Sequence, residues 1–256
     1  MRTLCLFMLV LFWIPESDAA ALNGNVLAEI VSQFRQVPDS EPSDMEGGGQ
    51  FSFLMALTPE QCTGANINQN VQFVPSYSGG PVIKGSVNYF LNNPLINYIA
   101  VYPYQGSRCS ESKLLHFTQE DWDYGRSDSA ALLLQNIINN RPVYNRLQVG
   151  CVILYTTYTP CIRSCFSDYE NCEILGALGQ QPFSHSWAGA QIQKYFVFSK
   201  LYPHDNNMNR IPIVRNKLGE VAEAGFNIRM CDGTSGIYCI ECSYPGYCIE
   251  APYWKK

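Results

Sequence analysis

The sequence has little charge, no long apolar segment beyond its first residues, and no Asn-x-Ser/Thr acceptor for N-glycosylation. Charged side chains make up 15% of the 256 residues, and 17 basic against 22 acidic residues give a net charge of −5. This balance gives no overall electrostatic attraction to a polyanion such as nucleic acid. Without internal repeats or a membrane-spanning run, the expected class is a soluble globular chain.

The first twenty residues carry the features of a secretory signal peptide. Arg2 supplies a positive charge, residues 4–14 are apolar, and Ser17 and Ala19 are small residues at a cleavage site. The apolar run is too short to span a bilayer. We therefore expect a signal peptide at residues 1–20, a secreted extracellular protein, and no membrane partner. The mature chain would hold 16 basic and 20 acidic residues.

Eleven cysteines are unusually informative for a chain of this size. Cys5 would leave with the signal peptide, and the remaining ten are at positions 62, 109, 151, 161, 165, 172, 231, 239, 242 and 248. An even number in an oxidising compartment is typical of disulfides, so five bridges without a metal is one interpretation. The four cysteines of the Gly/Tyr/Ser-rich tail favour disulfides most, although the pairing cannot be deduced.

Apolar periodicity predicts a layered α/β fold. The expected helices are residues 25–37, 109–122, 127–140 and 212–225, and the expected strands are residues 51–57, 96–104, 147–157, 194–202 and 226–231. The polar stretch from 58 to about 86 and the cysteine-rich tail show no such period. Strands that alternate with helices in the second half indicate crossover units and a mixed sheet with helices on both faces.

Two pairs of residues suggest a zinc site. Cys161 and Cys165 follow Pro160, where a helix can begin, and a spacing of four puts both thiols on one helix face. Thiolates at that position favour zinc. Cys109 supplies a third ligand, and Glu111 follows it by two residues. Zinc would acidify a water molecule, and Glu111 would carry its proton to a nucleobase, turning cytosine into uracil.

These motifs resemble those of the AID/APOBEC zinc-dependent cytidine deaminases. The resemblance rests on "CSESKLLHFTQEDW" with its Asp121–Trp122 pair, "TTYTPC", "FVFSKLY" and "LGEVAEAGFNIRM". It covers roughly residues 95–232, and more loosely 25–94. With its signal peptide and extra cysteines, the chain looks most like the secreted AID/APOBEC-like branch. The resemblance implies a three-layer cytidine deaminase-like fold, with a mixed five-stranded sheet flanked by helices and a disulfide-rich C-terminal tail.

The resemblance also implies roles for individual residues. One zinc ion per chain would be held by Cys109, Cys161 and Cys165, with Glu111 as the catalytic proton shuttle. Substrate would be bound by Tyr158, Thr159, Tyr202 and His204, the first two at the base and the last two at neighbouring nucleotides. The implied substrate is single-stranded DNA or RNA, with a free cytidine-type nucleoside as the competitor. Removing three ligands leaves seven cysteines, an odd number. Cys151 in its apolar run is the expected free thiol, and an intermolecular bridge is the alternative.

The sequence departs from the family pattern in its first ligand, Cys109, where AID and the APOBECs use histidine. The expected helix 127–140 also enlarges the gap between the two half-motifs, which are Cys109 with Glu111 and Cys161 with Cys165. Basic residues are few. Lys200, Arg210, Arg215 and Lys217 against Asp205 give a local charge of about +3, which a solvated helix face explains equally well. Two alternatives therefore stand: a deaminase-fold extracellular binding protein without catalysis, and a disulfide-stabilised secreted protein without zinc. The expected organisation is a signal peptide at 1–20, a deaminase-like domain at 21–232 and a Cys-rich extension at 233–256.

Overall fold

A computed structural model describes residues 21–35, 51–64, 72–78, 82–88, 98–101, 110–116, 131, 134–135, 149–167, 173–233, 236–242 and 247–250. The expected signal peptide, the expected ligand Cys109 and the Asp121–Trp122 pair lie outside these residues. Within them, no helix combines the length and the apolar character that crossing a membrane requires.

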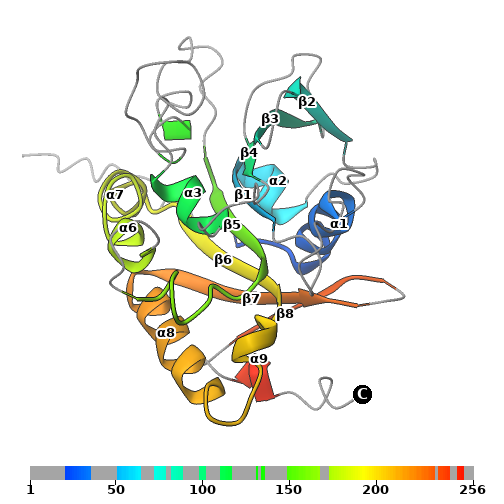
Figure 1. Cartoon of the computed structure of the whole chain (residues 1–256). Coiled ribbons are helices and arrows are strands. Elements are labelled where there is room, and N and C mark those ends of the chain that lie inside the picture. Colours follow the sequence, from blue (N-terminus) through cyan, green and yellow to red (C-terminus); the bar gives the residue numbers. More distant parts are fainter. Residues whose placement is uncertain are drawn as a thin grey trace, which may run out of the picture.

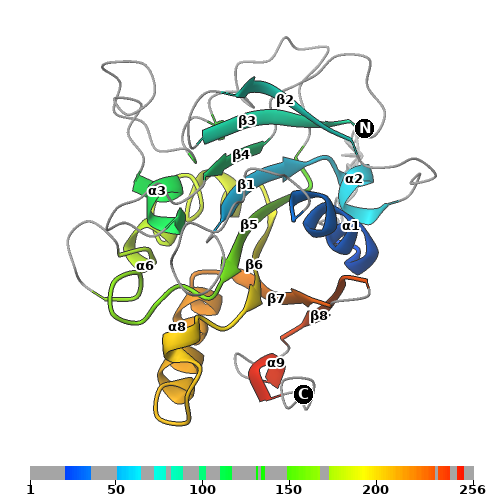
Figure 2. The ribbon, with the colours of Figure 1, turned by 45° about the vertical axis from the view of Figure 1, so that its right-hand side comes forward.

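The described strands form one mixed sheet of eight strands in the order β2-β3-β4-β1-β5-β6-β7-β8 (Figure 1). They are β1 (Ser52–Leu57), β2 (Gln72–Ser78), β3 (Val82–Asn88), β4 (Tyr98–Val101), β5 (Cys151–Tyr158), β6 (Gln193–Lys200), β7 (Phe226–Asp232) and β8 (Tyr238–Glu241). The pairs β5–β6 and β6–β7 are parallel, and the other neighbouring pairs are antiparallel. Figure 2 shows the full width of this sheet.

The five predicted strands are β4, β1, β5, β6 and β7, which are consecutive in the sheet and confirm its mixed five-stranded centre. β2 and β3 extend it on one side, in the polar stretch where the sequence showed no strand period, and β8 extends it on the other. β2 and β3 were missed because Pro75 and Gly85 interrupt their strand pattern. β8 has only four residues, and the Cys231–Cys239 disulfide ties it to the directly opposite residue of β7.

Helices cover both faces of the sheet, so the fold is a three-layer α/β structure (Figures 1 and 2). They are α1 (Gly24–Phe34), α2 (Pro59–Thr63), α3 (Ser110–His116), α6 (Leu175–Leu178), α7 (Ser186–Gly189), α8 (Ile211–Glu223) and α9 (Tyr247–Glu250), with a 3₁₀ turn η2 (Pro203–Asp205). α1 and α2 pack on one face, and α3, α6, α7 and α8 pack on the other. The predicted helices 25–37 and 212–225 are confirmed as α1 and α8, and α3 lies within the predicted helix 109–122. Of the predicted helix 127–140, residues 131, 134 and 135 are described, and they are helical.

β5 is buried on both faces, as its uninterrupted apolar run predicts. Val152 and Leu154 belong to the core under α3 and α8. Cys151, Ile153 and Tyr155 point the other way, into the core under α1. The alternation follows from the two-residue period of a strand. One strand therefore serves as the shared wall of two hydrophobic cores.

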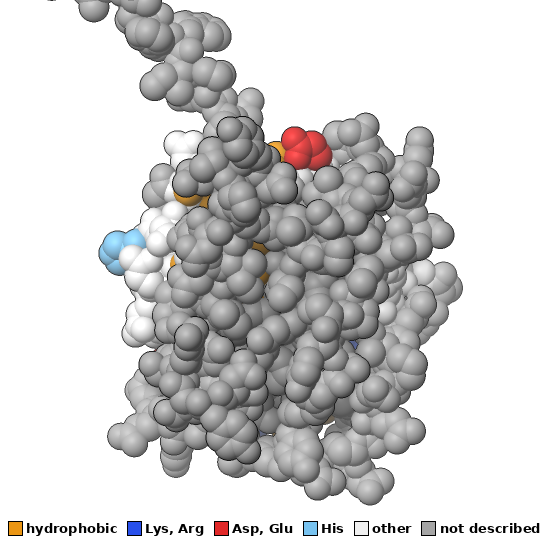
Figure 3. All heavy atoms as spheres, turned by 90° about the horizontal axis from the view of Figure 1, so that it is seen from above, with side chains coloured by type: hydrophobic (Ala, Val, Ile, Leu, Met, Phe, Trp, Pro, Cys, Tyr) orange, Lys and Arg blue, Asp and Glu red, His pale blue; other side chains and the backbone are white. Residues whose placement is uncertain are grey.

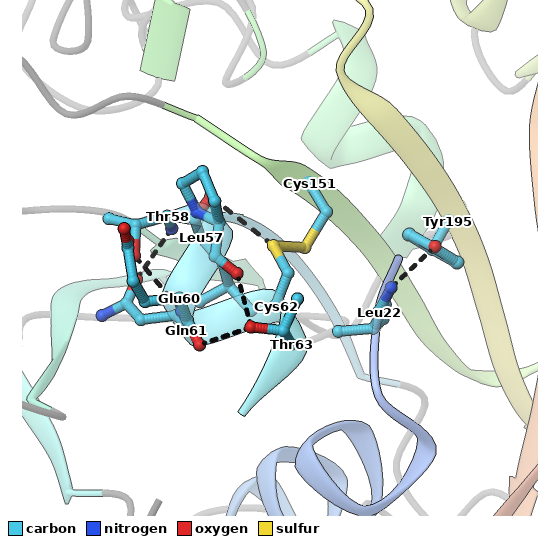
Figure 4. The surroundings of a disulfide bond; sticks show 10 residues. Leu22, Leu57, Thr58, Glu60, Gln61, Cys62, Thr63, Cys151 and Tyr195 are labelled. Atoms are coloured by element: carbon cyan, nitrogen blue, oxygen red, sulfur yellow. Dashed lines mark hydrogen bonds between the residues drawn. A yellow bond between two sulfur atoms is a disulfide. The ribbon is translucent and has the colours of Figure 1, made fainter. Parts of the chain in front are cut away.

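Three disulfides have both of their cysteines in the described part of the chain. Cys231–Cys239 and Cys242–Cys248 confirm that the tail is disulfide-linked. Cys62–Cys151 corrects the prediction that Cys151 is a free thiol (Figure 4). β1 pairs Leu57 with Cys151, and the chain then turns into α2, which brings Cys62 back beside the start of β5. The sequence separation of 89 between these cysteines hides the contact from the sequence.

Candidate active site

The candidate site lies where β5 and β6 end. Parallel strands end at the same edge of a sheet, so the segments that follow them lie side by side. Tyr158 and Lys200, the last residues of β5 and β6, are paired. The Thr159 amide donates to the Lys200 carbonyl at 2.8 Å, and the buried Thr159 hydroxyl accepts a hydrogen bond from the Tyr202 amide at 3.0 Å. This edge brings together three of the residues predicted to bind substrate.

Three rings form a row along this edge. The Tyr158 and Tyr202 rings meet edge to face with their centroids 6.4 Å apart, and the Tyr202 and His204 ring centroids are 5.4 Å apart. Tyr158 and Tyr202 are half-buried, whereas His204 is exposed. The rings of Tyr158, Tyr202 and His204 therefore share one surface, which runs from the half-buried Tyr158 to the exposed His204, whereas the Thr159 side chain is buried at this edge.

The two tyrosines keep their phenolic protons at neutral pH. Burial raises the pKa of Tyr158 above its ordinary value, with a smaller contribution from Tyr155. Burial also raises the pKa of Tyr202, and the neighbouring Cys161 and Asp205 raise it further. Both hydroxyls can therefore act as hydrogen-bond donors.

Cys161 and Cys165 lie on a single turn, which corrects the prediction of a helix that begins at Pro160. The amides of Cys165 and Phe166 donate to the Cys161 carbonyl at 3.0 and 3.1 Å, and the turn ends there. One helical turn suffices to align residues four apart. The two sulfur atoms are 3.5 Å apart, so the predicted side-by-side arrangement of the thiols is present without the helix.

The distance between the Cys161 and Cys165 sulfur atoms is close to the distance between two thiolates that bind one zinc ion. Two thiolates on one tetrahedral zinc stand about 3.8 Å apart. Cys161 is a free thiol, and the Ser164 hydroxyl lies 2.7 Å from its sulfur. Cys165 is disulfide-bonded in the structure. In the described residues no cluster of three His, Cys, Asp or Glu side chains can hold a metal, and the expected third ligand, Cys109, is not among them. A metal would require Cys165 in its reduced form.

Glu111 is fully buried in the first turn of α3, which packs against β1 and β4. Its Oε2 accepts a hydrogen bond from the Ser110 hydroxyl at 3.3 Å, and its Oε1 accepts one from the Thr156 hydroxyl. Ser110 in turn contacts the Ser52 hydroxyl of β1. A buried carboxylate needs such donors, because desolvation without them is costly. These contacts hold the Glu111 carboxylate in one orientation.

Thr156 connects Glu111 to the strand that carries the rest of the site. Its hydroxyl contacts Glu111 Oε1 and also lies 2.8 Å from the Tyr158 carbonyl oxygen. A hydroxyl carries one hydrogen, so it can donate to one of these oxygens at a time. The proton position at Thr156 therefore links the Glu111 carboxylate to the backbone at Tyr158.

We expect Thr156→Val to lower the free energy of unfolding by about 1–3 kcal/mol, because it removes the one buried hydroxyl that donates either to Glu111 or to the Tyr158 carbonyl. Thr156→Ser keeps the hydroxyl and serves as the matched variant. Urea unfolding of both variants measures the difference. Equal stability of the valine and serine variants would show that these contacts contribute nothing.

Sequence reasoning missed Ser110, Thr156 and Asp205. Thr156 could have been found from the sequence. It occupies the same strand face as Val152 and Leu154, so the strand period predicts a polar side chain that points into a core. Asp205 had no such signal, because its partner next to Cys161 comes from another segment. Its carboxylate accepts from the Ile162 amide at 2.9 Å. Such pairs arise only when the loops after β5 and β6 meet.

The expected positive patch is partly neutralised within the chain. Arg210 pairs with Asp205 at 2.9 Å, and Lys217 pairs with Glu220 at 2.9 Å. In the view from above, the described side chains include a histidine at one margin and an acidic group at another (Figure 3). That view faces away from α8, so the two ion pairs, and not this surface, describe the patch.

No curated protein and no solved structure matches the chain significantly. The model of one protein family does match, over residues 24–243. Its description is Secreted Novel AID/APOBEC-like Deaminase 1. The match spans both half-motifs, the sheet from β1 to β8 and the first three cysteines of the tail. The chain therefore belongs to the Secreted Novel AID/APOBEC-like Deaminase 1 family.

Proposed function

We propose that this chain is a secreted zinc-dependent deaminase that hydrolyses the exocyclic amine of cytosine to give uracil and ammonia. The observation that carries the proposal is the buried Glu111 carboxylate, tied through Thr156 to the strand that leads to Tyr158 and Cys161. A fully buried carboxylate beside the end of a parallel strand suits proton transfer in a water-poor site. Membership of a deaminase family supports the same reaction.

The proposed reaction needs residues that hold a metal, transfer protons and bind the base. Cys161 and Cys165, with Cys109, would hold the zinc ion. When bound, zinc supplies an acidified water molecule. Glu111 would accept a first proton from that water and give it to the base nitrogen, and would then carry a second proton from the hydroxyl added to C4 to the exocyclic amine, which leaves as ammonia. Tyr158 would line the base pocket.

The substrate contacts follow from the same edge of the sheet. The Thr159 hydroxyl accepts from the Tyr202 amide, so its own hydrogen is available to an acceptor on the base. Tyr202 and His204 would contact a neighbouring nucleotide, since aromatic rings stack on bases of any sequence. Single-stranded nucleic acid is the preferred substrate class on family likeness, with a free nucleoside as competitor. Rates on oligonucleotides that fall as salt rises would favour the polynucleotide.

The disulfide at Cys165 supports a second candidate, an extracellular binding protein with the deaminase fold and no catalysis. A sulfur in a disulfide is not a thiolate ligand, so zinc binding and this disulfide are alternative states of Cys165. The two candidates therefore differ in the redox state of one residue.

Metal analysis of the mature secreted protein tests the proposal. We expect about one zinc per chain, its loss in Cys161→Ser, and its retention when the distant Cys231–Cys239 disulfide is replaced by two alanines. Peptide mapping should find Cys161 and Cys165 alkylatable after zinc is chelated. Folded protein without zinc and with Cys165 oxidised would overturn the proposal and favour the binding protein. Zinc-loaded protein that is inactive on cytidine, single-stranded DNA and RNA would favour it too.

A further inference from the structure

We propose that Asp205 is a positioning residue that fastens the segment after β6 to the turn carrying Cys161, and so fixes the Cys161 thiol. Its consequence for zinc rests on the proposed function, whereas its consequence for the backbone does not. Asp205 lies in η2 and is 1% exposed. It belongs to neither the ligand set nor the substrate residues named above.

Both carboxylate oxygens of Asp205 are engaged inside the protein. Oδ2 accepts the hydrogen bond from the Ile162 amide at 2.9 Å. Oδ1 pairs with Arg210 Nη1, also at 2.9 Å. Burial of a carboxylate is costly unless it is paired and hydrogen-bonded, and these two contacts provide both. Ile162 follows Cys161 directly, so the carboxylate holds the peptide group that joins the two residues.

Arg210 ties the segment from Pro203 to Arg210 together through contacts within the segment. Its Nη1 also donates to the His204 carbonyl at 3.1 Å, and the Asn207 side chain donates to the same carbonyl at 3.0 Å. The Arg210 amide donates to the Asn207 side chain at 3.1 Å. The segment therefore meets the Cys161 turn as one piece, and Asp205 is the point of contact.

The same geometry assigns different tasks to neighbouring residues of this loop. Asp205 faces inward with both oxygens occupied, so it is not available to hydrogen-bond a base. His204 is exposed, and Tyr202 is held separately by Thr159. Substrate contacts are therefore expected from Tyr202 and His204. A loop that shifts to accept substrate would pull on the Cys161 turn through Asp205.

The test compares Asp205→Ala and Asp205→Asn with Glu241→Ala in the secreted protein. Glu241 forms an ion pair of similar length with Arg229, at 3.0 Å on the far side of β7, and controls for loss of a carboxylate–arginine pair. Amide hydrogen exchange is followed over residues 161–167. In zinc-loaded protein, removal of the metal by a competing chelator is measured as well.

We expect Asp205→Ala to accelerate exchange at Ile162 and to weaken zinc retention about tenfold or more, as for other residues that orient metal ligands. Asp205→Asn keeps an acceptor for the amide and should fall between alanine and wild type. Glu241→Ala should match wild type in both measurements. Unchanged exchange and unchanged zinc retention in Asp205→Ala would overturn the inference.

The outcomes separate this inference from the proposed function. If wild-type protein holds no zinc, the proposed function fails, and exchange at Ile162 alone decides whether Asp205 fastens the turn. If Asp205→Ala does not fold, Asp205→Asn decides: faster exchange confined to residues 161–167 supports the inference, and wild-type exchange there overturns it.

Discussion

Glu111→Gln should slow deamination by about 10²–10⁴-fold while zinc stays bound. Glutamine has the size of glutamate and can still meet the Ser110 and Thr156 hydroxyls, so the fold and the metal ligands are preserved. It cannot take up and release a proton at neutral pH. The rate is measured as uracil formed from cytidine and from a single-stranded oligonucleotide, beside zinc content for each preparation.

Glu220→Gln is the matched control for this substitution. Glu220 lies on α8, where it pairs with Lys217 near the surface and takes no part in the candidate site. Its variant should keep wild-type activity. Near-wild-type activity in a zinc-loaded Glu111→Gln protein would remove Glu111 from the mechanism, and the buried carboxylate would then need a structural explanation.

The second large effect is expected on stability. Replacing Cys62 and Cys151 together by alanine should lower the free energy of unfolding by about 4–5 kcal/mol, because this disulfide closes a loop of 89 residues in the unfolded chain. Both side chains are fully buried, so alanine introduces no polar group. Chemical denaturation of the double variant measures the loss.

The Cys242–Cys248 disulfide provides an internal comparison. It spans six residues, for which the same chain-entropy reasoning gives about 2 kcal/mol. The order of the two losses is the informative result. Equal losses, or a larger loss at Cys242–Cys248, would mean that strain or local contacts outweigh loop length.

The sequence contained enough to predict the centre of the fold because the central strands are apolar and separated by amphipathic helices. β5 and β6 are buried on both faces, and no polar alternation disguises them. β2 and β3 could not be predicted, since their Pro, Gly and Ser residues carry little local preference for strands. They are defined by pairing with each other and with β4, which is a property of the folded chain.

The candidate site divides in the same way. Glu111, Cys161 and Cys165 were found because each belongs to a short local spacing, whereas two of the contacts that orient this site come from distant parts of the sequence. Thr156 is 45 residues from Glu111, and Asp205 is 43 residues from Ile162. Sequence motifs identified the chemical groups, and tertiary contacts determine how these groups are held.

The alternation along β5 has a consequence for how mutations sort. The odd-numbered residues from Cys151 to Tyr155 face the α1 side, where Cys151 forms its disulfide with Cys62. The even-numbered residues Val152, Leu154 and Thr156 face the α3 side, where Thr156 contacts Glu111. Odd-numbered and even-numbered positions of β5 are therefore under different structural constraints. Substitutions at the odd positions are expected to change the free energy of unfolding, and substitutions at Thr156 are expected to change the proposed chemistry as well. Apolar substitutions could change the packing on the α1 side of β5 while the residues on its α3 side stay unchanged.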